Sequence, residues 1–243
     1  MSTRPLETVG APAQIALTIE HTLLRPEAMP EQIDRLCDEA VELGFVGVCV
    51  SPLYVKRVVE RLAAACPRRE PVAPPFVVSV AGFPLGASLP ATKAEEARRA
   101  IDDGANEIDM VVALGALIAG DRVTVRKDIE AVARAVHTAG PGKVLKVILE
   151  CAALTTEQIS LGCRCAMEGE ADYVKTSTGF HPAGGATVDH VRLLHRYGSP
   201  LKVKAAGGIR TAEAARAMLE AGAVRIGTSS GVAITRELLG KPI

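Results

Sequence analysis

The chain contains 243 residues, and its 28 Lys and Arg residues balance 28 Asp and Glu residues, so the formal net charge is zero. A neutral chain argues against a nucleic-acid or membrane-surface partner held by net charge. Hydrophobic residues make up 48% of the chain and aromatic residues only 3%. This composition is typical of a globular protein with an aliphatic core, built as one domain of α/β-barrel size or as two smaller domains.

Cysteine usage and hydropathy indicate the cellular compartment. The six cysteines show no paired spacing, and the N-terminus has no basic and apolar segment of the kind that a signal peptide carries. No run reaches the roughly 18 apolar residues that a membrane helix needs. We therefore expect a reduced, cytoplasmic protein with no membrane partner.

Eight short apolar runs rich in Val and Ile recur along the chain and are predicted to form β-strands. The segments between them repeat apolar residues with the i, i+3, i+4 spacing of a helix, as at Ile33, Leu36 and Cys37. The spacing between successive strands is roughly 30 residues, which is the length of one βα unit. The strands are expected at residues 17–22, 45–51, 76–82, 107–113, 144–150, 172–177, 201–206 and 224–229.

The helix boundaries carry their own signals. Pro30 suits a first helical turn, and Thr211 can cap a helix. Thr92 with Glu95 and Thr155 with Gln158 fit the spacing of a capping box. Four glycines, which favour the left-handed backbone that ends a helix, stand where helices should end. They are Gly44, Gly104, Gly198 and Gly222.

Strands that are apolar on both faces and alternate with helices predict a parallel sheet, and eight units in this length predict a closed (β/α)₈ TIM barrel of the α/β class. An open doubly wound sheet usually has a Gly-rich loop after its first strand, whereas this chain has residues 20–24 with the sequence EHTLL there. We expect a single barrel domain over residues 15–243, preceded by a loose N-terminal arm over residues 1–14.

Only nine of the 28 basic residues are lysines, and five of those nine lie in apolar runs, at Lys143, Lys146, Lys175, Lys202 and Lys204. Because the active site of such a barrel lies at the carboxyl ends of the strands, polar residues late in a strand are the first candidates. Side chains of a strand alternate between its faces, so we expect Lys175, Lys204 and Asp109 to point into the barrel.

Two inward lysines predict amine chemistry. Burial and a neighbouring ammonium group both lower the pKa of a lysine, so we expect a neutral, nucleophilic amine at this pair. A neutral lysine can attack a carbonyl group and form a Schiff base. Asp109 can balance the second ammonium group and relay protons. An ion pair without catalytic use is the alternative interpretation of these residues.

The ends of strands seven and eight predict an anion site. Gly207 and Gly208 follow strand seven, and residues 227–231, with the sequence GTSSG, lead into the last helix. Backbone N–H groups at a helix start bind anions, and phosphate commonly binds at these loops in such barrels. We predict that the loops bind a phosphate group.

Other residues carry weaker signals. The five histidines form no closely spaced ligand set with a carboxylate or thiolate, so we expect no metal. Cys49 lies late in strand two and lines a pocket or packs as a small apolar residue. The segment 82–86, with the sequence GFPLG, is a substrate loop or only a turn.

Three motifs resemble the signatures of deoxyribose-phosphate aldolases: YVKTSTG at 173–179, KVKAAGGIR at 202–210 and GTSSG at 227–231. The segments HTLL at 21–24, VCV at 48–50, GFP at 82–84 and EIDM at 107–110 follow in the order of that family, so the resemblance runs from about residue 15 to about residue 239.

The resemblance implies a class I aldolase that needs no metal or other cofactor. Such an enzyme reversibly cleaves 2-deoxy-D-ribose 5-phosphate into D-glyceraldehyde 3-phosphate and acetaldehyde in deoxynucleoside breakdown. It also implies a homo-oligomer, a dimer or tetramer. By position, Lys175 matches the Schiff-base lysine, and Asp109 and Lys204 match the proton-relay pair. Substrate-binding positions are matched by Thr22, Cys49, Thr178, Gly179, Gly207, Gly208, Ser229 and Ser230.

Two positions depart from the pattern of many family members. Glu20 stands where many have Asp, and its longer side chain is expected to displace a carboxylate that helps to bind sugar hydroxyl groups. Phe180 stands where some members have Lys, so phosphate binding is expected to depend more on backbone amides and serine hydroxyl groups. Both departures affect substrate preference and not the covalent chemistry.

Two other functions are compatible with the same residues. One is a different Schiff-base barrel enzyme that acts on another phosphosugar. The other is a barrel that binds a phosphorylated ligand without catalysis, which the buried amines argue against, since burying them without use is unfavourable.

Overall fold

The computed structural model describes residues 12–66 and 74–240. Most of the predicted arm over residues 1–14 lies outside the described residues, and from Pro12 onward the chain forms a short helix. Eight parallel strands pair in chain order, and β8 pairs with β1, so the sheet is closed. The strands are β1 (Ile19–Leu23), β2 (Gly47–Val50), β3 (Phe76–Ala81), β4 (Glu107–Val111), β5 (Val144–Ile148), β6 (Tyr173–Lys175), β7 (Lys202–Ala206) and β8 (Arg225–Thr228).

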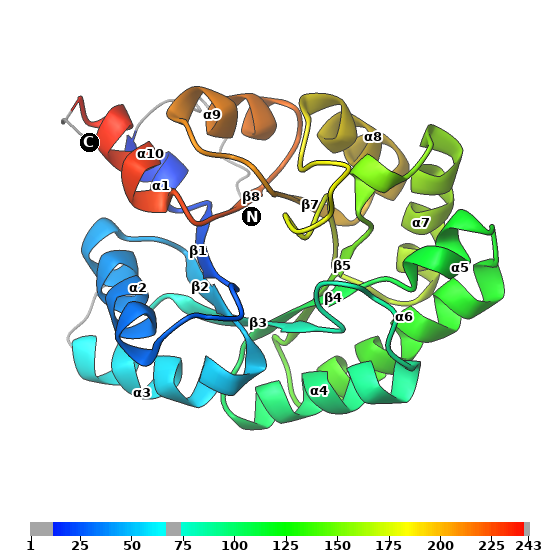
Figure 1. Cartoon of the computed structure of the whole chain (residues 1–243), viewed down its shortest axis with the longest axis horizontal. Coiled ribbons are helices and arrows are strands. Elements are labelled where there is room, and N and C mark those ends of the chain that lie inside the picture. The colour runs from blue at the N-terminus through cyan, green and yellow to red at the C-terminus, as the bar shows by residue number, and fades with distance from the viewer. Residues whose placement is uncertain (1–11, 67–73, 241–243) are drawn as a thin grey trace, which may run out of the picture.

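Helices surround the ring of strands on the outside (Figure 1). The predicted closed (β/α)₈ barrel is confirmed. The α-helices are α1 (Pro12–Ala16), α2 (Pro30–Leu43), α3 (Val55–Ala65), α4 (Pro90–Asp102), α5 (Leu114–Ile118), α6 (Arg122–His137), α7 (Thr156–Glu168), α8 (Val188–Gly198), α9 (Ala212–Glu220) and α10 (Gly231–Leu238), with 3₁₀ turns η1 (Pro52–Tyr54) and η2 (Cys151–Ala153).

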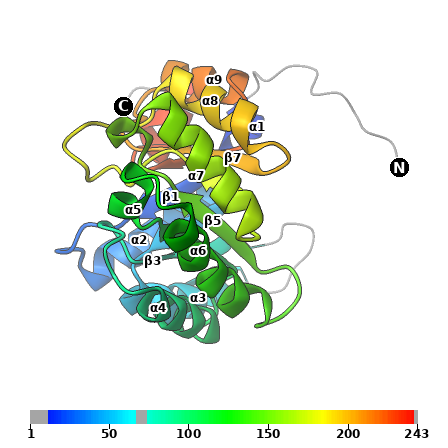
Figure 2. The same cartoon turned by 90° about the vertical axis from the view of Figure 1, so that its right-hand side faces the viewer.

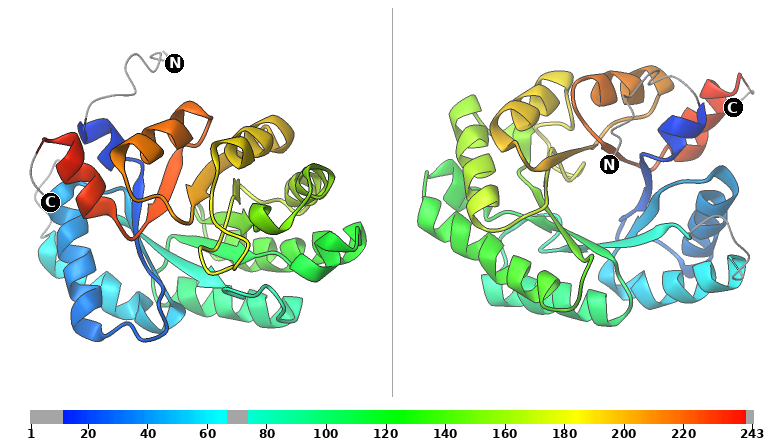
Figure 3. Two further views of the ribbon diagram at one scale, coloured as in Figure 1. Left: turned by 45° about the horizontal axis from the view of Figure 1, so that its top comes forward. Right: turned by 180° about the vertical axis from the view of Figure 1, so that it is seen from behind.

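The ends of the barrel domain lie together. Helix α1 packs beside α10, as the two views of Figure 3 show in blue and red. The apolar core lies mostly between the strands and the helices. It is built from aliphatic side chains such as Ile108, Val147 and Leu145 on the strands and Ile129 and Val132 on α6. The inside of the barrel is therefore free to hold polar side chains.

Most of the predicted helix boundaries are confirmed. Thr155 and Gln158 form a complete capping box, and the Thr211 hydroxyl group accepts a hydrogen bond from the N–H of Ala214. Pro30 occupies the first turn of α2, and Gly44 ends that helix in the left-handed conformation, with φ of 66°.

One boundary prediction is wrong, and another is correct only in position. Helix α4 begins two residues before Thr92, at Pro90, so Thr92 lies inside the first turn and does not cap it. Helix α8 ends at Gly198 as predicted, but this glycine does not have a positive φ. Its missing side chain instead makes room for packing, because a Cβ atom there would lie 3.1 Å from Val174 Cγ2.

Candidate active site

The strand register brings the predicted catalytic residues together inside the barrel. Lys175 on β6 pairs directly with Lys204 on β7, and Asp109 lies on β4 with its side chain on the inner face. The carboxylate atom Asp109 Oδ2 accepts hydrogen bonds from Lys175 Nζ at 2.8 Å and from Lys204 Nζ at 2.6 Å. The predicted inward orientation of all three residues is confirmed.

A third lysine, to which the sequence analysis assigned no role in the site, joins this group. Lys146 on β5 pairs with Asp109 in the register, and its Nζ donates to Asp109 Oδ1 at 3.0 Å. It also forms ion pairs with Glu107 and, at 3.5 Å, with Glu20. Its presence among the five lysines of apolar runs was the signal that could have identified it.

Asp109 and Glu20 remain ionised in spite of complete burial. Burial alone would raise the pKa of Asp109, but Lys146, Lys175 and Lys204 outweigh it and hold this pKa well below its ordinary value. For Glu20, burial is again opposed by Lys146 and Lys204, and the pKa is lowered.

Lys204 is the second, charged lysine of the pair, which Asp109 was expected to balance. Burial lowers its pKa, but the facing carboxylates of Asp109 and Glu20 outweigh burial and raise the pKa of Lys204. The same balance, with Asp109, Glu20 and Glu107 opposing burial, raises the pKa of Lys146 well above its ordinary value. Both lysines are therefore held as ammonium groups.

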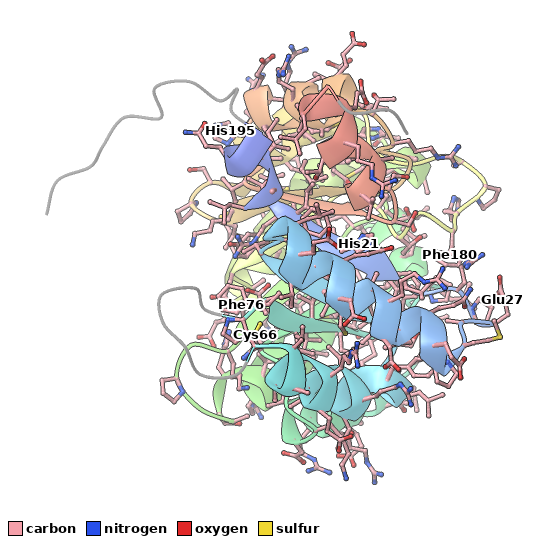
Figure 4. The ribbon with its side chains drawn as sticks, turned by 90° about the vertical axis from the view of Figure 1, so that its left-hand side faces the viewer. His21, Glu27, Cys66, Phe76, Phe180 and His195 are labelled. Carbon is pink, nitrogen blue, oxygen red and sulfur yellow. The ribbon has the colours of Figure 1, made fainter. Side chains whose placement is uncertain are left out.

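A pocket of about 640 Å³ opens above these charges at the carboxyl ends of the strands. Lys175 lies at its floor and is 3% exposed, whereas Asp109 and Lys204 are completely buried below. The segments after β1 and β6 extend at this same end of the barrel, in blue and yellow in Figure 2. Figure 4 labels Phe180 at this end and Phe76, the first residue of β3, at the opposite end.

Six of the eight predicted substrate-binding residues line this pocket, and two do not. Cys49 is completely buried, packs with Val78 and Val80 beneath the pocket and is not among the lining residues. Ser230 is the N-cap of α10 and also lies outside the lining, and its N–H group donates to the Thr228 hydroxyl group. The lining includes Thr22, Thr178, Gly179, Gly207, Gly208 and Ser229.

The loops after β6 and β7 pack against each other with little room for side chains. Gly179 and Gly207 have φ of 83° and 96°, and their Cα atoms face each other. A Cβ atom at Gly185 would lie 2.3 Å from the carbonyl oxygen of Gly207, and the N–H of Ala186 donates to that oxygen at 3.0 Å. The glycines thus allow the two backbones to approach at the edge of the pocket.

Glu150 fixes the start of the loop after β6. It is a non-glycine residue with φ of 61°, which is a strained backbone conformation. Its buried carboxylate accepts hydrogen bonds from the N–H of Thr178 at 3.2 Å and from the Thr178 hydroxyl group at 2.5 Å. These hydrogen bonds orient Thr178, a residue of the pocket lining.

The rim carries cations that the sequence analysis did not identify. Arg25, Arg35 and Arg210 line the mouth of the pocket, against one carboxylate, that of Glu39. Arg25 directly follows the HTLL segment, which forms the end of β1, so its place at a strand end was a usable signal, whereas Arg35 comes from α2. Phe180 lines the pocket and packs edge-to-face on Phe83, with the ring centroids 5.2 Å apart, whereas none of residues 82–86 is itself among the lining residues.

Glu20 does not reach the pocket. Its side chain is buried under the lysines and forms ion pairs with Lys204, Lys146 and Arg225. The carboxylate therefore lies away from the pocket, in line with the expectation that the longer side chain displaces it. His21, the next residue, lines the pocket and contacts Glu39 Oε2 on α2 at 2.8 Å.

Residues 12–66 and 74–240 contain neither a metal-binding cluster nor a membrane-spanning helix. No cluster of three or more His, Cys, Asp or Glu side chains there could hold a metal ion. No helix in this part of the chain is long and apolar enough to cross a membrane.

Comparison with known proteins places these features in a family. The model of the DeoC/LacD family aldolases matches residues 15–241. A deoxyribose-phosphate aldolase from Brevibacillus brevis is 51% identical over 89% of this chain and 92% of its own length. Another from Thermococcus gammatolerans is 52% identical over 90% of this chain and 94% of its own. The tetrameric deoxyribose phosphate aldolase from Aeropyrum pernix superposes with a TM-score of 0.86 at 31% identity, over 96% and 94% of the two chains.

Proposed function

The chain belongs to the DeoC/LacD family of aldolases, and on this premise we propose that it reversibly cleaves 2-deoxy-D-ribose 5-phosphate into D-glyceraldehyde 3-phosphate and acetaldehyde. The reaction serves the breakdown of deoxynucleosides. The curated relatives at about half identity over nine-tenths of the chain support this substrate.

One observation carries the assignment of roles. Among the three lysines that touch Asp109, Lys175 alone lines the pocket, and Lys146 and Lys204 lie buried below it. The nucleophile is therefore Lys175, and Asp109 with Lys204 forms the proton-relay pair beneath it.

Catalysis begins with the open-chain form of the sugar. The Lys175 amine attacks the C1 aldehyde carbon, the carbonyl oxygen takes up protons and leaves as water, and an iminium bond joins C1 to Nζ. The ionised Asp109 carboxylate stabilises this cation, because its Oδ2 atom lies 2.8 Å from Nζ.

Cleavage follows from the electron demand of the iminium group. The C3 hydroxyl group gives its proton to the Asp109 and Lys204 relay through a water molecule, the C2–C3 bond breaks, and its electron pair moves toward the nitrogen to form an enamine. Carbons C3 to C5 leave as D-glyceraldehyde 3-phosphate. Return of the proton to C2 and hydrolysis of the iminium bond release acetaldehyde and restore the amine.

The phosphate group binds at the far side of the pocket from the relay. The backbone at Gly207, Gly208 and Ser229 offers N–H groups, and Arg210 adds a cation at the rim. Because Phe180 replaces a lysine found in some members, the rim arginines carry more of the charge interaction in this chain.

Trapping the covalent intermediate tests the proposal. The protein is incubated with acetaldehyde and reduced with borohydride, and the adduct is mapped by mass spectrometry. We expect an adduct on Lys175 that is absent from Lys175→Ala, together with loss of turnover in that variant. An unchanged adduct in Lys175→Ala, or none in the wild type, would sink the assignment.

Substrate range separates the proposed reaction from the alternatives. A panel of aldehydes and phosphorylated acceptors, assayed by turnover, should show the highest kcat/KM with 2-deoxyribose 5-phosphate. A preference for another phosphosugar would indicate a different Schiff-base enzyme, and stoichiometric binding without turnover would indicate a binding protein.

We also propose that the enzyme is a cytoplasmic homo-oligomer, a dimer or tetramer. The tetrameric relative from Aeropyrum pernix supports assembly, and the six unpaired cysteines are those expected of a reducing compartment. Light scattering after gel filtration is expected to give a mass of two or four chains, and a monomer would contradict this.

A further inference from the structure

A connected set of ion pairs runs through the barrel interior from the strand starts to the pocket floor. Within residues 12–66 and 74–240, it joins four cations to three anions. The cations are Lys146, Lys175, Lys204 and Arg225, and the anions are Glu20, Glu107 and Asp109. The network carries one positive charge more than its carboxylates can balance.

Lys146 stands at the middle of this network. It is completely buried, faces both Asp109 and Glu20, and forms a third pair with Glu107. Its contact with Asp109 is made to Oδ1, while Oδ2 receives Lys175 and Lys204. Lys146 thereby fixes the rotation of the carboxylate, so that one oxygen atom points down and the other lies between the two lysines of the reaction.

Resting on the function proposed above, we propose that Lys146 is a positioning residue that orients Asp109. Because Lys146 keeps its positive charge, Lys175 is the lysine of the network that loses its proton. With Lys175 neutral, three cations face three anions and the interior is balanced. Removing a proton from Lys146 or Lys204 instead would leave buried carboxylates without their nearest cations.

The groups around the reacting amine agree with this choice. Lys175 faces Asp109 on β4 and Lys204 on β7, with the Cys49 thiol of β2 nearby. The pKa of that thiol is raised to about 11, mainly by burial, so it adds no negative charge at neutral pH. Around Lys146, the Tyr173 ring on β6 lies 5.9 Å from Nζ and contributes a cation–π contact.

The test is the pH dependence of kcat/KM with 2-deoxyribose 5-phosphate in Lys146→Met. Without this cation the network is balanced only when Lys175 is protonated, so the acid limb of the profile should move to higher pH. Both ammonium groups contact the same carboxylate and lie within about 8 Å of each other, so repulsion at an effective dielectric constant of about 20 predicts a shift of about one to two pH units.

Two further variants make the test independent of folding losses. Glu107→Gln removes an anion from the same network, so its acid limb should move in the opposite direction, to lower pH. Lys93→Met is the matched control, because Lys93 is also completely buried and paired with a carboxylate, Asp128 at 2.7 Å, outside the barrel interior. Its profile should keep the wild-type pH limb even if its activity falls.

The outcomes separate the inference from the function on which it rests. An adduct on Lys175 in wild-type protein, with opposite shifts in the two network variants, supports both. Adducts in all proteins with superimposable pH profiles would overturn the role of Lys146 while leaving the aldolase mechanism intact. If the wild type forms no adduct, the proposed function fails and the inference falls with it.

Discussion

Replacing Gly185 by alanine perturbs the pocket loops without touching any reacting group. Gly185 does not have a positive φ, so its backbone accepts an alanine. The added methyl group would lie 2.3 Å from the Gly207 carbonyl oxygen and 2.6 Å from its carbon, where ordinary contacts begin near 3.4 Å. The loops after β6 and β7 must therefore separate by about 1 Å.

The separation has two consequences of different size. The hydrogen bond from Ala186 N–H to Gly207 is lost or weakened, which lowers the free energy of unfolding by about 1 kcal/mol. Displacement of Gly207 and Gly208 moves the proposed phosphate-binding amides, and a misplacement of this size can lower kcat/KM by about 10². We expect a loss of about 10- to 100-fold with 2-deoxyribose 5-phosphate and a smaller loss with unphosphorylated 2-deoxyribose.

The assay is steady-state kinetics with both substrates, alongside Gly115→Ala as a matched control. A methyl group at Gly115 in α5 meets no atom within 4 Å, so its kinetics should be unchanged and its stability equal or higher by up to about 1 kcal/mol. Retention of kcat/KM within about twofold in Gly185→Ala would refute the close-packing argument. Equal losses with the two substrates would refute the link between these loops and the phosphate.

Three more predictions concern stability and cofactor use. Lys93→Met should lower the free energy of unfolding by about 3–5 kcal/mol, because it leaves the buried Asp128 carboxylate without its cation. Urea titration should show that the double variant Lys93→Met with Asp128→Asn regains part of this free energy, and no regain would contradict the reasoning. The lowered pKa of Asp109 contributes stability that is present above about pH 4 and is lost as the pH falls through the pKa of the folded state. The raised pKa of Lys204 contributes stability that is present below about pH 10.4 and is lost as the pH rises through the pKa of the folded state. A free energy of unfolding that does not change with pH over both ranges would contradict the network. Turnover should survive dialysis against a chelator, and loss restored by added metal would contradict the proposed chemistry.

The barrel and its three central residues could be predicted because their signals are local and periodic. Eight apolar runs with helical segments between them define the units, and the period of two along a strand places Lys175 and Lys204 on the inner face. The register of the folded barrel then pairs these two residues directly. Functional residues that depend only on their place within one strand could therefore be predicted from the sequence.

What could not be predicted depends on side chains meeting from distant parts of the chain. Glu20 on β1 adds to Asp109 in keeping Lys204 charged, and Arg35 reaches the pocket from a helix and not from a strand end. The exclusion of Cys49 from the pocket lining depends on its burial against Val78 and Val80. The sequence pattern of a single strand cannot predict such contacts between distant parts of the chain.

The ion pair of Lys204 with Glu20 joins residues 184 positions apart in the chain. Because Glu20 on β1 is translated long before Lys204 on β7, a chain that has not yet been extended through β7 cannot assemble this charge network. Until then, the carboxylates of the earlier strands have no buried lysine partners and stay exposed to water. The surroundings of the Lys175 amine are therefore complete only after both β1 and β7 have been made and have met in the closed barrel.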